Sequence, residues 1–88
     1  MTSFYCKTVC DGDGAAIRAF HATRDTFDSV PEVTGHARKR FGSAILWRFD
    51  DAPEVVAQMI EVLRRSEYFR GVVEISEQDF WQSPSNGV

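Results

Sequence analysis

The first part of the chain shows two hydrophobic patterns, one typical of a strand and the next typical of a helix. Residues 3–10 predict a strand with Phe4, Cys6, Thr8 and Cys10 on one face and Tyr5, Lys7 and Val9 on the other. Behind Asp13, a good helix cap, apolar residues recur at helical spacing as far as Phe27. We therefore expect a strand and then an amphipathic helix that ends near Ser29, ahead of Pro31.

A hairpin is expected to follow that helix. Residues 33–41 are polar and basic with weak alternation, whereas residues 44–49 are apolar on both faces except at Arg48. Gly42-Ser43 between them predicts a tight turn. We interpret the first segment as an edge strand and the second as a central strand.

The strongest local signal comes next. Asp51, Pro53 and Glu54 combine a capping side chain, a first-turn proline and an acid near the helix start. They predict a helix that ends before Arg70-Gly71, and residues 72–75 then form a short last strand. We expect Phe80-Trp81 to fold back onto a single domain spanning residues 1–82, and residues 83–88 to form a loose tail.

The predicted order of strand, helix, strand, strand, helix, strand is that of two split βαβ units. Such units build the ferredoxin-like α+β sandwich, a four-stranded antiparallel sheet with both helices on one face and with the first and third strands central. The residues expected beneath the helices are Phe4, Cys6, Ile45, Trp47, Phe49, Val73 and Ile75. The other face would then present Tyr5, Lys7, Val9, Leu46, Arg48, Val72 and Glu74. Because this open face is partly apolar, we expect a second copy of the chain or another protein to cover it. The residues expected at that interface are Tyr5, Lys7, Val9, Leu46 and Val72.

Composition narrows the class of protein. The 88 residues are 43% hydrophobic, enough for one packed core, and the net charge of -3 argues against binding nucleic acid through bulk positive charge. No apolar run approaches the roughly 20 residues of a membrane-spanning helix, and Met1 to Cys6 lack the features of a signal peptide. The expected location is the cytoplasm.

Candidate chemistry is sparse. The sequence contains no nucleophile motif, no zinc-binding helix motif and no phosphate-binding glycine loop, so we expect no catalytic residues, metal or cofactor. If residues 3–10 form a strand, Cys6 and Cys10 lie about 13 Å apart, too far for a disulfide. An enzyme of the dimeric α+β barrel type, which needs few polar groups, stays open as an alternative. A pocket containing His21 or His36 would favour it.

Positive charge is concentrated in one segment. Between His36 and Phe49 the chain has four positive charges, Arg38, Lys39, Arg40 and Arg48, and no negative charge. We interpret them as a basic edge that binds a small anionic ligand or a protein partner.

Residues 39–45 also resemble the RNP1 signature of RNA recognition motifs, although Arg40 and Ser43 replace a glycine and a stacking aromatic. An RNA-binding module therefore stays open as a second alternative. It requires Trp47 and Tyr5 to share the open face, which would bury Arg48, so we expect Trp47 to be buried and nucleic acid not to bind.

A second resemblance covers about residues 4–76. Val30-Pro31-Glu32-Val33, Gly42 before Ile45-Leu46-Trp47, and Arg70-Gly71-Val72-Val73 before a last strand resemble the effector-binding modules of Lrp/AsnC-type regulators and, more loosely, ACT domains. The resemblance implies modules that pair through their sheets and bind small molecules at their interfaces. The DNA-binding helices of those regulators are lacking, and Arg38-Lys39-Arg40 stands where they have a less charged strand. We therefore expect a stand-alone, non-enzymatic regulatory or accessory module.

Overall fold

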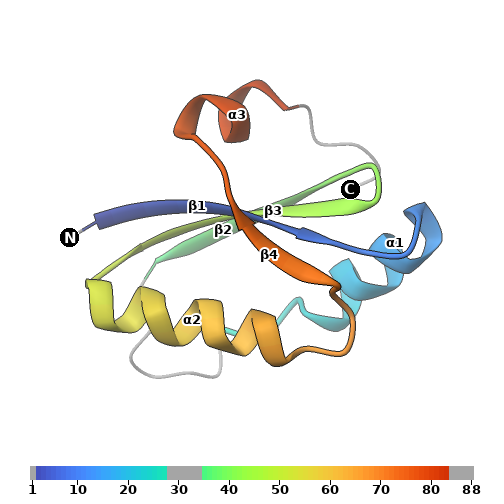
Figure 1. Ribbon diagram of the computed structural model, residues 1–88, viewed down its shortest axis with the longest axis horizontal. Coiled ribbons are helices and arrows are strands. Elements are labelled where there is room, and N and C mark those ends of the chain that lie inside the picture. The colour runs from blue at the N-terminus through green and yellow to red at the C-terminus, as the bar shows by residue number, and fades with distance from the viewer. Residues whose placement is uncertain (1, 28–34, 84–88) are drawn as a thin grey trace.

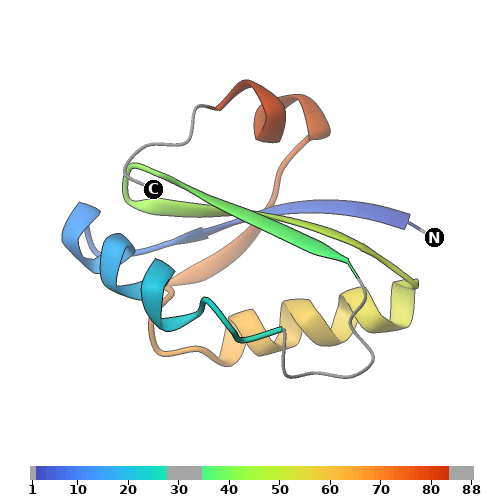
Figure 2. The same ribbon diagram turned by 180° about the vertical axis from the view of Figure 1, so that it is seen from behind.

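The chain folds into a four-stranded antiparallel sheet with helices on both faces (Figure 1). The computed structural model describes residues 2–27 and 35–83. Its elements are β1 (Thr2–Val9), α1 (Asp13–Ala22), β2 (His36–Phe41), β3 (Ala44–Asp51), α2 (Pro53–Arg65), β4 (Gly71–Glu74) and α3 (Glu77–Gln82). The strand order is β2-β3-β1-β4, so the predicted α+β class, antiparallel sheet and central first and third strands are confirmed. Figures 1 and 2 show α1 and α2 on one face, called the helix face, and α3 on the other, called the α3 face.

The main core lies between the sheet and the helices α1 and α2. The residues of β1 and β3 that were predicted beneath the helices pack there, because side chains alternate between the two faces of a strand. Trp47 is fully buried, as expected, and Phe27 packs edge-on against the rings of Trp47 and Phe49. Met59 and Leu63 of α2 complete this core.

The face assignment of β4 was wrong. Val72 stands opposite Thr8 and packs against the core of the helix face, whereas Val73 stands opposite Lys7 and is 51% exposed on the α3 face. The strand has only four residues and two adjacent valines. Alternation therefore gave no signal for its register, and a shift of one residue exchanges the two faces.

The helix α1 is shorter than predicted. It ends at Ala22, where the Thr23 hydroxyl donates a 2.7 Å hydrogen bond to the Ala19 carbonyl. Residues 23–27 continue as turns that still bring Phe27 into the core. Pro31 lies outside the described residues.

The predicted side-chain caps of both long helices were also wrong. Asp13 is the first residue of α1 rather than its cap, which is Gly12 at φ 101°. The cap of α2 is Ala52, and the carboxylate of Asp51 accepts a hydrogen bond from the Ala52 backbone amide.

A third helix corrects the prediction of two helices on one face. The hydroxyl of Ser76 accepts a 3.0 Å hydrogen bond from the Asp79 amide and so caps α3. Phe80 on this helix is buried against Leu46 and Tyr5, with the two rings 5.4 Å apart. The expected return of Phe80 therefore takes the form of a helix that covers the middle of the α3 face.

Candidate functional site

The four basic residues predicted to form one edge are divided between two faces. In the register of β2 and β3, Arg38 stands opposite Trp47 and Arg40 opposite Ile45, both on the helix face. Lys39 stands opposite Leu46, and Arg48 of β3 stands opposite Tyr5, both on the α3 face. Consecutive residues of a strand point to opposite faces, so a run of three basic residues cannot build one basic surface. The single basic edge is a wrong prediction.

The two arginines on the helix face have structural partners. Arg38 donates hydrogen bonds to the Phe20 carbonyl and, at 3.1 Å, to the Thr23 hydroxyl, and its guanidinium lies 4.0 Å from the centre of the Phe20 ring. It thereby holds the C-terminal end of α1 against the sheet. Arg40 is buried and donates to the Gly42 carbonyl at 2.9 Å, across the hairpin turn. Neither arginine is free to act as a ligand site.

The two basic residues on the α3 face hold α3. Lys39 donates to the Ser83 carbonyl, and its ammonium lies 4.6 Å from the centre of the Phe80 ring. Arg48 forms a 3.0 Å ion pair with Asp50, and its guanidinium lies 5.4 Å from the Trp81 ring. These contacts hold the C-terminal part of α3 over the sheet.

The predicted sheet-face interface is only partly available. Tyr5 and Leu46 are buried beneath Phe80, and Val72 lies on the opposite face. Lys7 and Val9 are half-buried on the α3 face. Two exposed apolar residues of the same face, Phe41 and Val73, were not included in the prediction. We call the surface formed by Lys7, Val9, Phe41 and Val73 the hairpin half of the α3 face.

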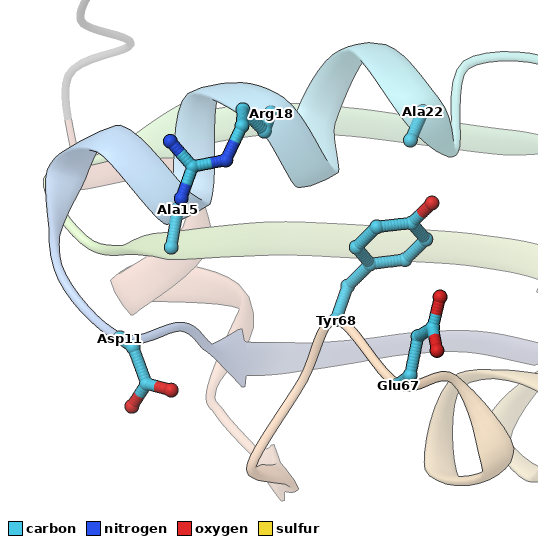
Figure 3. Close-up of a pocket in the computed structure, with 6 residues that line it drawn as sticks. All are labelled: Asp11, Ala15, Arg18, Ala22, Glu67 and Tyr68. Carbon is cyan, nitrogen blue, oxygen red and sulfur yellow. The ribbon is translucent and has the colours of Figure 1, made fainter.

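Two cavities lie on the other side of the molecule, beside the turn that joins α2 to β4. One, of about 370 Å³, is lined by Asp11, Ala15, Arg18, Ala22, Glu67 and Tyr68 (Figure 3). The second, of about 340 Å³, is lined by Ala22, Thr23, Thr26, Val62, Leu63, Arg65, Ser66, Tyr68 and Phe69. Ala22 and Tyr68 border both cavities, so the two adjoin each other. Each has the size of a small-molecule site.

The charged groups around these cavities differ in their partners. Asp11 forms an ion pair with Arg70, and Arg65 forms one of 3.1 Å with Glu61. Within residues 2–27 and 35–83, Arg18 and Glu67 form no ion pair. Figure 3 shows the Tyr68 ring between the Arg18 and Ala15 side of the first cavity and Glu67. The first cavity is thus charged, and the second is lined chiefly by apolar groups.

Neither cysteine is chemically activated. Burial, together with the charge of Glu74, raises the pKa of Cys6 to about 12. Burial and the nearby carboxylate of Asp11 also raise the pKa of Cys10. Both thiols are free, and both are protonated at neutral pH, so neither supplies a nucleophilic thiolate.

Other chemistry finds little support in the part of the chain that the structure describes. Neither His21 nor His36 lines either of the two cavities beside Tyr68. The described residues contain no cluster of three or more metal-binding side chains, and none of their helices could cross a bilayer. Trp47 and Tyr5 are buried and cannot stack on RNA bases.

Comparisons with protein-family models, curated proteins and solved structures found no match for this chain. The site beside Tyr68 was not predicted from the sequence either. Arg18 has the helical spacing of an ordinary solvent-exposed position, and Glu67-Tyr68 belongs to a turn without a motif. These residues become neighbours only when α1 and the turn after α2 lie on the same face of the sheet.

Proposed function

We propose that the protein is a cytoplasmic, non-enzymatic accessory module that binds a small anion with an apolar body in the two cavities beside Tyr68. The observation that carries this proposal is the unpaired guanidinium of Arg18 at a charged cavity that adjoins an apolar one. The proposal keeps the small anionic ligand expected from the sequence but moves it from the β2 residues to the helix face.

Charge determines which end of the ligand lies where. The ion pair with Arg70 offsets the carboxylate of Asp11, so Arg18 is the available cation of the first cavity. A carboxylate bound there would accept charge-assisted hydrogen bonds from the guanidinium. The hydroxyl of Tyr68 supplies a further donor at the boundary between the cavities.

The apolar part of the ligand fits the second cavity. Val62, Leu63 and Phe69 line it, and Val62 is 43% exposed. Covering this surface would provide the hydrophobic part of the affinity, at about 25 cal/mol per Å² of apolar area removed from water. Glu67 would disfavour ligands with more than one negative charge.

The fold is proposed to be ferredoxin-like, with α3 as an addition. The sheet order β4-β1-β3-β2 and the placement of α1 and α2 on one face support this assignment. Small-molecule binding also agrees with the resemblance to the Lrp/AsnC-type modules. The regulatory role and that kinship remain proposals.

Two probes with the same apolar body and opposite charges test the function. In a titration followed by amide NMR shifts, we expect 4-phenylbutyrate to shift Arg18, Ala22 and Phe69 and to bind more tightly than 4-phenylbutylamine. Arg18→Gln should weaken binding of the carboxylate roughly tenfold or more, the loss of one charge-assisted hydrogen bond. Glu67→Gln should strengthen it.

The matched control is Arg24→Gln. Arg24 is an exposed arginine just beyond α1 that does not line the two cavities and pairs with Asp25. Its loss should leave the affinity unchanged. Equal binding of the two probes, or an equal effect of the two arginine variants, would contradict the proposal.

A further inference from the structure

The hairpin half of the α3 face is a continuous surface with exposed apolar groups. Phe41 and Val9 both stand opposite Ala44, so they flank the same position of β3. One register step away, Lys7 stands between Leu46 and Val73. Phe41 is 42% and Val73 51% exposed, at opposite edges of the sheet. This surface is the part of the α3 face that α3 leaves uncovered on the hairpin side.

Opposite charges lie in the same place. A shallow cavity of about 190 Å³ beside α3 is lined by Lys7, Phe41, Leu46, Ile75, Asp79 and Ser83. Lys7 and Asp79 both border it, yet neither forms an ion pair in the part of the chain that the structure describes. Lys7 is half-buried among apolar side chains, where an ammonium group gains most from a carboxylate partner.

We infer that a second copy of this chain covers the hairpin half, with Lys7 of each copy paired with Asp79 of the other. In a two-fold dimer the same patch meets itself, so a patch with one cation and one anion can form two reciprocal ion pairs. The apolar residues Phe41 and Val73 are buried by the same contact. The inference is independent of the proposed ligand and uses the opposite side of the molecule.

The charge of the patch favours this occupant. The chain carries a net charge of -3, so two copies repel each other over long distances and attract only where local charges alternate. Lys7 of the hairpin half and Asp79 beside it balance each other in charge, unlike the chain as a whole. A strongly basic partner would gain from the net charge but would meet Lys7 at the centre of the contact.

The test is a charge exchange read by sedimentation equilibrium between 1 µM and 500 µM without added ligand. The unaltered chain should show a concentration-dependent dimer. Lys7→Asp and Asp79→Lys should each weaken dimerisation roughly tenfold or more, while the chain carrying both changes regains most of the affinity, because the reciprocal pairs form again with reversed sign. Val73→Lys should give a monomer.

Two controls separate the interface from general effects. Glu77→Lys places the same charge change in the first turn of α3 without touching the cavity, and Ile17→Lys places the same cation on α1, at an apolar residue of similar exposure. Neither should change the dimer affinity, and circular dichroism checks that every variant is folded. A monomer at all concentrations would overturn the inference. So would a double variant that dimerises no more tightly than the single variants. A dimer that Ile17→Lys disrupts and Val73→Lys leaves intact would also overturn it. Arg18→Gln should affect ligand binding alone, so the two proposals can fail separately.

Discussion

The indole nitrogen of Trp47 donates a 3.0 Å hydrogen bond to the hydroxyl oxygen of Thr8, and both side chains are fully buried. The Thr8 hydroxyl in turn donates to the Ile45 carbonyl at 3.3 Å. Thr8 therefore satisfies the polar atom of the largest core side chain without a charged group. This pair allows Trp47 to point into the core, which removes it from any surface that could bind a ligand or RNA.

Replacing Thr8 with valine tests this pairing. Thr8→Val preserves the shape of the side chain but leaves the buried indole N–H of Trp47 without its partner, so the free energy of unfolding should fall by about 1–3 kcal/mol. Urea unfolding followed by tryptophan fluorescence measures the change. Thr8→Ser, which keeps the hydroxyl acceptor, should leave the emission of the buried indole unchanged. Full stability of Thr8→Val would show that the bond contributes nothing.

Arg38 is predicted to stabilise the end of α1 rather than to bind a ligand. Arg38→Met keeps an apolar stem over Phe20 but removes the donors to the Phe20 carbonyl and the Thr23 hydroxyl. We expect the free energy of unfolding to fall by about 1–2 kcal/mol and amide exchange to accelerate over residues 20–23. Arg64→Met, on the exposed surface of α2, is the control and should change stability by less than about 0.5 kcal/mol. Equal effects of the two changes would contradict this role.

Phe80 should account for most of the attachment of α3. Its ring is buried against Tyr5 and Leu46, whereas its neighbour Trp81 is 56% exposed. Phe80→Ala should lower the free energy of unfolding by about 3 kcal/mol, and Trp81→Ala by much less. The Phe80 change should also raise binding of a hydrophobic dye, because it uncovers the middle of the α3 face. Unchanged amide shifts of residues 77–82 in Phe80→Ala would show that α3 stays attached without the ring and would contradict this prediction.

The buried thiol of Cys6 should weaken the fold at alkaline pH. Its pKa in the folded chain is about 12, above the ordinary 9.0, so between these values the unfolded chain loses a proton that the folded chain keeps. The free energy of unfolding contributed by this thiol is therefore fully present below pH 9 and falls by about 1.4 kcal/mol per pH unit above it. Urea unfolding at pH 7, 9 and 10 should show that the stability advantage over Cys6→Ala shrinks slightly between pH 7 and pH 9 and by about 1 kcal/mol between pH 9 and pH 10. A stability difference between the two chains that does not change with pH would contradict this prediction.

Local pattern was sufficient to predict the longer elements of this protein. Pattern identified Cys6 as a core residue through the alternation in β1, and it identified Trp47 and Phe49 because the opposite face of β3 carries Arg48. It also predicted the order of the strands and the central position of two of them. Pattern failed where a segment was short, as in β4 and α3, because four or six residues give too few repeats to fix a register or a helix.

The candidate surfaces depended on the tertiary structure. Sequence proximity grouped Arg38, Lys39 and Arg40, but the strand period separates them. Arg38 holds α1, Lys39 holds α3, and Arg40 bonds to the hairpin turn. Arg18 and Tyr68 are 50 positions apart and border one cavity only because α1 and the turn after α2 lie on the same face of the sheet. Likewise, α3 determines which part of the sheet stays exposed, by burying Tyr5 and Leu46 and leaving Phe41 and Val73 uncovered. Which side chains alternate along a strand depends on neighbouring residues and can be read from the sequence, whereas the surfaces available for binding follow from packing between distant segments.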